Sequence, residues 1–174
     1  ALVIKNNLFG IDIDERASSL ASFALVMKAL EKDRAFLEKG ICPNIIALKE
    51  ISRDPASIGI AMSSELKKSF SYLKEVKNFG SLIPVSEKCA DEIDAVTRRI
   101  KSKGAPDFLE EEVLEGLSQL KYLSPRYHCV ITNPPYMGGK GMNARLSEWA
   151  KSNYPDSKSD LFAMFIERCF SLTV

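Results

Sequence analysis

In the first fifty residues, the pattern of apolar positions predicts short buried strands. Leu8–Ile13 and Asn44–Leu48 are short, apolar runs of the kind found in buried parallel strands. Between them, Asp14 suits the N-cap of a long helix that Gly40 would end. Its apolar positions recur at helical spacing: Leu20, Ala24, Met27 and Leu30. The order predicts a strand-helix-strand unit with parallel strands.

From about Pro55 to Leu123 the spacing becomes helical throughout. Three amphipathic segments carry their apolar residues three or four positions apart, and Gly104-Ala105-Pro106 separates the last two. Their apolar positions are Met62, Leu66, Phe70 and Leu73, then Cys89, Ile93, Val96 and Ile100, then Leu109, Val113, Leu117 and Leu120. We predict a helical insertion, residues 55–124, whose helices pack on one another.

Asn133-Pro134-Pro135-Tyr136 follows a third apolar run, His128–Ile131, which we predict to be a strand. Two prolines stop a strand abruptly and make a rigid turn. In open α/β sheets, ligands bind at the carboxyl ends of strands. Asn133 Oδ1 and the Pro134 carbonyl could accept the two hydrogens of a planar amino group, while Tyr136 covers the attached ring. Beyond this turn, we expect Met137–Gly141 to form a mobile lip and Leu161–Leu172 a buried helix.

The amino-acid composition limits the possible functions less than these patterns do. The chain has 174 residues and a formal net charge of +1, so it lacks the basic surplus of a freestanding DNA-binding domain. Any DNA contact must come from a local patch or from another part of the protein. The four cysteines form no C-x-x-C pair, which predicts neither a metal site nor disulfides and favours a reduced, cytoplasmic setting. We expect no membrane span and no signal peptide.

Three segments together resemble S-adenosylmethionine-dependent DNA adenine-N6 methyltransferases. Asn133–Tyr136 looks like the family's catalytic motif, Asn7–Ala17 like its second strand, and Lys158–Arg168 like the helix after the catalytic loop. The likeness is greatest to large enzymes of restriction-modification and phage-exclusion systems, and it covers roughly the first and last fifty residues. It implies an internal fragment of such an enzyme, with a partial Rossmann-like α/β core and a helical insertion.

The resemblance also implies roles for individual residues. Asn133, Pro134, Pro135 and Tyr136 would form the catalytic loop that acts on an adenine of double-stranded DNA. Asp12 would bind the cofactor ribose, with Asp14 as the competing choice, and Glu50 would meet the cofactor adenine. His128 is more simply explained as a packed residue than as a base. The family's glycine-rich cofactor loop is absent, because Ala1–Asn7 leaves no room for it, so we expect the isolated chain to be inactive or nearly so.

Two rival interpretations remain open at this point. One is an amino-group methyltransferase that acts on RNA or on a protein glutamine, and the other is a non-catalytic helical interaction module. The predicted organisation is residues 1–54 for the cofactor-binding part, 55–124 for the insertion and 125–174 for the catalytic loop. In the family's sheet the missing first strand separates the strand of Asp12 from that of Asn133. We therefore expect Leu8–Ile13 to pair with Cys129–Thr132, or the chain to self-associate.

Overall fold

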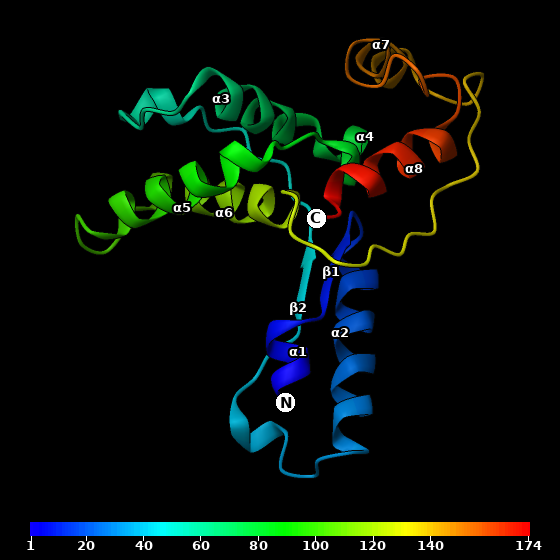
Figure 1. The fold of residues 1–174 in the computed structure, drawn as a ribbon. Helices are drawn as coiled ribbons and strands as arrows, with labels where there is room; N and C mark the ends of the chain where they lie inside the picture. The colour runs from blue at the N-terminus through cyan, green and yellow to red at the C-terminus, as the bar shows by residue number, and fades with distance from the viewer. The chain divides into compact units, whose positions relative to one another are not determined.

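The computed structural model describes residues 1–174, which form two compact units, Ala1–Lys49 and Glu50–Val174 (Figure 1). The first unit holds the sheet, which has two parallel strands, and the second unit is helical. The predicted α/β class is confirmed at this level. The finer division at residues 54 and 124 stays a prediction.

The first unit is the strand-helix-strand arrangement that the sequence predicts. Strand β1 (Phe9–Asp12) pairs in parallel with β2 (Asn44–Ala47), and Asp12 lies opposite Ala47. Helix α2 (Glu15–Leu30) connects them and packs on both strands, and the short helix α1 (Leu2–Asn6) precedes β1. The Asn44 amide ties α1 to the sheet, because its Nδ2 lies 2.8–3.2 Å from the carbonyl oxygens of Ile4, Lys5 and Leu8.

Asp14 caps α2 as predicted, but the helix ends earlier than predicted. The Asp14 Oδ1 accepts hydrogen bonds from the backbone of Ala17 (3.2 Å) and Arg16 (2.7 Å), and these bonds lower the pKa of its carboxyl. The helix stops at Leu30, whereas Gly40 ends the 3-10 turn η1 (Leu37–Lys39) with a φ of 60°. The prediction was wrong because the residues after Leu30 form turns, within which Phe36 is fully buried.

The face of α2 that we expected to be buried is exposed. Leu20 and Met27 are 68% and 47% exposed, and neighbouring Phe23 is 60% exposed. Ser18, the one buried residue of α2, lies against the sheet instead, and its hydroxyl donates to the Ile46 carbonyl (3.2 Å). A small side chain at this position allows the helix to lie close to the strands.

The first part of the second unit is a helical layer with a continuous apolar core. It comprises η2 (Pro55–Ile58), α3 (Ser64–Ser71), η3 (Tyr72–Glu75), α4 (Val76–Phe79), η4 (Gly80–Leu82), α5 (Glu87–Lys101) and α6 (Phe108–Tyr122). Helices α3, α5 and α6 pack on one another, and all but two of the predicted apolar positions are buried; Met62 and Leu109 are half-buried. The three helical segments are therefore confirmed. Asp107 and Glu110 form a capping box that starts α6.

The sequence did not reveal helix α7 (Ala144–Asn153), which begins at the N-cap Asn143. Its Trp149 is stacked on Phe79 of α4, with ring centroids 4.4 Å apart and planes inclined by 15°. Arg145 of the same helix forms an ion pair with Glu75 (2.6 Å), and its guanidinium lies over the Phe79 ring, 5.5 Å from the ring centroid. A single tryptophan and a charged pair thus anchor a helix whose exposed face is polar.

The predicted strand His128–Ile131 does not form. After α6 the chain is irregular, and its one β-bridge in this region joins Tyr127 to Thr173. A strand needs a neighbour to take up its backbone groups, and β1 pairs only with β2. The expected pairing of Leu8–Ile13 with Cys129–Thr132 would join the two units, and like self-association it stays a prediction.

Candidate active site

The Asn133–Tyr136 turn presents its polar and aromatic groups outward. Pro134 is buried, whereas Asn133, Pro135 and Tyr136 are exposed, Tyr136 to 89%. The Asn133 amide makes no hydrogen bond within the chain, so both its oxygen and its nitrogen are available. A buried proline beside an exposed amide fixes the backbone while leaving the side chain free to bind a ligand.

Backbone hydrogen bonds join the residues after Tyr136 to the start of α8 (Leu161–Leu172). The amide of Leu161 donates to the Met137 carbonyl (3.0 Å), and that of Gly139 donates to the Ser159 carbonyl (2.8 Å). Glycine suits this close approach, since a Cβ at Gly139 would lie 3.2 Å from the Ser159 oxygen, which is a tight contact. This segment is therefore held by backbone pairing, in contrast to the mobile lip that we expected.

Tyr136 and Phe162 form a stacked aromatic pair at this junction. Their ring centroids are 6.3 Å apart and their planes differ by 13°. Phe162 lies in the first turn of α8, where the Asp160 side chain caps the helix by accepting from the Phe162 amide (2.8 Å). The pair makes a flat apolar platform beside Asn133. Phe162 lay inside a recognised segment, but nothing in the sequence indicated its contact with Tyr136.

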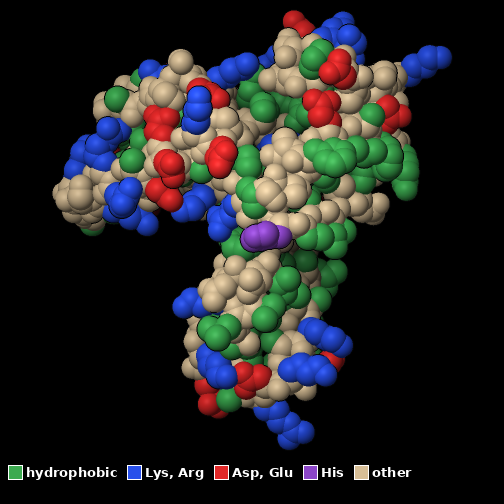
Figure 2. Space-filling model, viewed as in Figure 1, with side chains coloured by type: hydrophobic (Ala, Val, Ile, Leu, Met, Phe, Trp, Pro, Cys, Tyr) green, Lys and Arg blue, Asp and Glu red, His purple; other side chains and the backbone are tan.

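Hydrophobic side chains extend the exposed apolar surface along α8. The bounds of the helix are those predicted, yet its burial is not, because Phe162, Ile166 and Phe170 are 43%, 46% and 77% exposed. Figure 2 shows hydrophobic side chains gathered over this region of the molecule. The opposite face, which carries Met164 and Arg168, packs into the unit.

A buried arginine fixes α8, and with it the platform. The Arg168 guanidinium is 2% exposed and donates to the carbonyl oxygens of Ser81 (2.8 Å) and Leu123 (2.5 Å) and to the hydroxyl of Ser171 (3.0 Å). Burial lowers the pKa of Arg168. The nearby Tyr154 hydroxyl donates to the Leu82 carbonyl (2.5 Å), and burial raises the pKa of Tyr154 to about 12.

Asp12 ends β1 with an exposed carboxylate. One oxygen, Oδ1, accepts from the Asp14 amide (2.9 Å), and its backbone carbonyl accepts from the Leu48 amide (2.7 Å), so Oδ2 is left for a ligand. Asp14 is committed to capping α2, which favours Asp12 over Asp14 as a ligand-binding group. Glu50 is exposed three residues beyond β2, in the second unit.

Nothing in the structure resembles a metal centre, because no group of three or more histidine, cysteine or acidic side chains is placed to hold a metal ion. The single histidine, His128, is exposed, which corrects the expectation that it is packed. The four cysteines are free, as predicted.

Comparison with known proteins places nearly the whole chain in one family. The family described as Eco57I restriction-modification methylase matches residues 6–174. The chain belongs to this methylase family. The match includes the three segments that carry the resemblance and also the helical region between them, in which no family motif is evident.

Two curated relatives of this methylase chain are similar over 98% of its length. One is an adenine-specific methyltransferase, BrxX, of Escherichia coli O9:H4 (strain HS), which is 35% identical over 204 residues. The other is an adenine-specific methyltransferase, PglX, of Lacticaseibacillus casei (strain Zhang), which is 34% identical over 190 residues. The chain spans 17% and 15% of these two proteins. The predicted family is therefore confirmed.

A membrane span would need a longer and more apolar helix than any in the structure.

Proposed function

We propose that this chain carries the catalytic loop and the ribose-binding strand of a DNA methyltransferase that modifies the N6 amino group of adenine. The observation that carries the proposal is the Asn133–Tyr136 turn, with a free amide beside an exposed aromatic platform. Both relatives are named as adenine-specific methyltransferases, which supports the same substrate. A cytoplasmic location would accompany this function.

The turn suits the difficulty of the reaction. The adenine amino group is a poor nucleophile because its lone pair is delocalised into the ring. Two acceptors, Asn133 Oδ1 and the Pro134 carbonyl, would hold its hydrogens out of the ring plane and so restore electron density on nitrogen. The nitrogen becomes cationic on attack and loses its proton afterwards, so no base has to act first. Catalysis here is positioning and electrostatic stabilisation.

Tyr136 would hold the target base by stacking. Enzymes that modify bases act on a nucleotide rotated out of the duplex, which needs an apolar surface for the base. The ring of Tyr136 is 89% exposed and lies nearly parallel to that of Phe162, with their centroids 6.3 Å apart. Phe162 is then a positioning residue, which sets the plane in which the base stacks.

S-adenosylmethionine is the methyl donor that this chemistry requires. Residues of this chain suit the ribose and adenine end of that cofactor. The open Oδ2 of Asp12, at the carboxyl end of a parallel strand, is suited to accept hydrogen bonds from a ribose diol. Glu50 is the residue we assign to the cofactor's adenine. At the position where a glycine-rich loop would be needed for the methionine portion, the chain has helix α1. A complete Rossmann-like core would need that loop from elsewhere in the protein.

A direct test is the product of the native full-length protein incubated with labelled S-adenosylmethionine and DNA. Digestion of the DNA should yield labelled N6-methyladenine. Label recovered only in RNA or in a protein glutamine would favour those substrates instead. No transfer to any of the three would favour a non-catalytic interaction module.

Asp12→Ala should weaken binding of S-adenosylmethionine by the native protein by about 1.5–3 kcal/mol, the value of a hydrogen bond to a charged group. Asp14→Ala is the matched control, because it removes an equivalent carboxylate two residues away. It should lower the stability of α2 with little effect on cofactor affinity. Calorimetry of both variants checks this, and equal affinities for Asp12→Ala and wild type would remove Asp12 from the site.

Micromolar binding by the isolated 174 residues would contradict the expected need for a further loop.

Tyr136→Ala should weaken retention of the flipped base by about 1–3 kcal/mol, and Phe162→Ala by less. Tyr136→Phe keeps the ring and should keep the affinity. The measurement is fluorescence of 2-aminopurine at the target position, which brightens when the base leaves the stack and is quenched on an aromatic platform. If Tyr136→Ala gives the wild-type signal, stacking on this residue is not how the base is held.

A further inference from the structure

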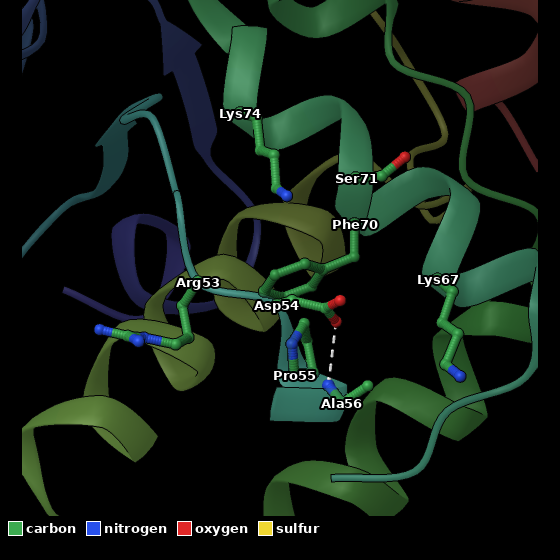
Figure 3. Close-up of a pocket in the computed structure, with 8 residues that line it drawn as sticks. All are labelled: Arg53, Asp54, Pro55, Ala56, Lys67, Phe70, Ser71 and Lys74. Carbon is green, nitrogen blue, oxygen red and sulfur yellow. Dashed lines mark hydrogen bonds between the residues drawn. The ribbon is translucent and has the colours of Figure 1, made fainter. Parts of the chain in front are cut away.

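The second unit contains a hollow that plays no part in the proposed methyl-transfer site. Its volume is about 210 Å³, and it lies where η2 meets α3 and η3. Phe70 and Pro55, both buried, form its apolar floor, and the charged residues on its walls are Arg53, Asp54, Lys67 and Lys74 (Figure 3). A ligand in this hollow would therefore meet apolar residues at the base and charged residues at the rim.

The positive charge around this hollow is not neutralised within the chain. Lys67 and Lys74 form no ion pair and no side-chain hydrogen bond. The charge of Arg53 is shared with Glu112, whose Oε2 lies 3.6 Å from its Nε, and Figure 3 shows this guanidinium directed away from Phe70. Asp54 uses Oδ1 to accept from the Ala56 amide (3.0 Å). Lys67 and Lys74 contribute two positive charges and Asp54 one negative charge, so the hollow attracts anions.

The positions of the two lysines favour a polymer over a single small anion. Lys67 lies in α3 and Lys74, seven residues later, lies in η3, which separates their backbones by about 10 Å or more. Figure 3 shows the two side chains on opposite sides of Phe70. With one ammonium group on each side of Phe70, the two lysines can each contact a separate phosphate. A nucleic-acid strand, with one charge every 3.4 Å or so along its axis, offers each lysine its own phosphate.

We propose that this lysine hollow binds the phosphate backbone of the DNA whose adenine is methylated, so that the helical insertion helps to hold the substrate. The inference rests on the proposed function. It also accounts for how a chain with a net charge of only +1 could contact DNA, since the contact is confined to a local patch. Such a contact positions the duplex without reading its sequence.

The test uses the native full-length protein and a duplex that the wild type methylates. In Lys67→Gln/Lys74→Gln, the slope of log affinity against log salt concentration should become shallower by about 1–2, because each lost phosphate contact contributes about 0.9. Affinity at low salt should fall by about tenfold or more, equally for specific and unrelated duplexes. Lys88→Gln/Lys101→Gln is the matched control. It removes the same charge from exposed positions of the same unit and should leave the slope unchanged.

The possible outcomes separate this inference from the proposed function. Equal slopes for the two double variants, in a wild-type protein that methylates DNA, would overturn the lysine hollow alone. A wild-type protein that methylates only RNA or protein would overturn the proposed function, and the inference with it. If Lys67→Gln/Lys74→Gln lost binding of inorganic phosphate while its DNA slope stayed that of the wild type, the hollow would be a small-anion site, against the proposal.

Discussion

Replacing Asn133 with alanine is expected to slow methyl transfer by about 10²–10³-fold while leaving the affinity for S-adenosylmethionine nearly unchanged. The amide has no structural hydrogen bond to lose, so the turn should keep its shape, supported by buried Pro134 and by the pairing of Met137 with Leu161. What is lost is an acceptor whose contact with the amino hydrogens strengthens as the nitrogen becomes cationic. Single-turnover kinetics measure this step apart from product release.

Thr132→Ala is the matched control for this prediction. Thr132 precedes Asn133 and is exposed, and its replacement removes a polar side chain of similar size from the same segment. It should leave the single-turnover rate within a few-fold of wild type. A variant at Asn133 that lost cofactor affinity and rate in equal measure would indicate that the residue shapes the cofactor site, and the amino-group role would then have to be abandoned.

The helices of residues 55–124 were predictable because the apolar residues of a helix such as α5 lie on a single face. In α5 the residues Cys89, Ile93, Val96 and Ile100 are buried and the intervening positions are mostly charged, so a single face can pack. Helix α2 lacks that contrast. It carries apolar residues on several sides, and periodicity alone could not indicate that Ser18 lies against the sheet while Leu20 and Met27 remain exposed.

The catalytic turn was predictable from its own residues, but its supports were not. Two prolines after an asparagine indicate a rigid turn wherever it lies. The stack of Tyr136 on Phe162 depends on a chain reversal between residues 26 positions apart, which no local pattern encodes. The wrong strand at His128–Ile131 has the related cause that an apolar run becomes a strand only where another strand is available to pair with it.

Loss of the Arg168 guanidinium is expected to destabilise the chain by about 2–5 kcal/mol, a large effect for a single substitution. Arg168 has no carboxylate partner. Its charge is compensated by carbonyl oxygens, and one of these belongs to Leu123 at the C-terminal end of α6, where the helix dipole is negative. Arg168→Ala leaves the carbonyl groups of Leu123 and Ser81 without these donors and opens a cavity beneath α8.

Comparison with methionine separates these two contributions. Arg168→Met fills most of the space but donates no hydrogen bond, so it should lose about 1–3 kcal/mol, the cost of the unpaired carbonyl groups. Phe170→Ala, on the exposed face of the same helix, should change stability by about 0.5 kcal/mol or less. Urea unfolding of the three variants gives the free energies. If Arg168→Met proved as stable as wild type, the desolvation of the buried charge would have cancelled its hydrogen bonds, and packing alone would hold α8 beneath the aromatic platform.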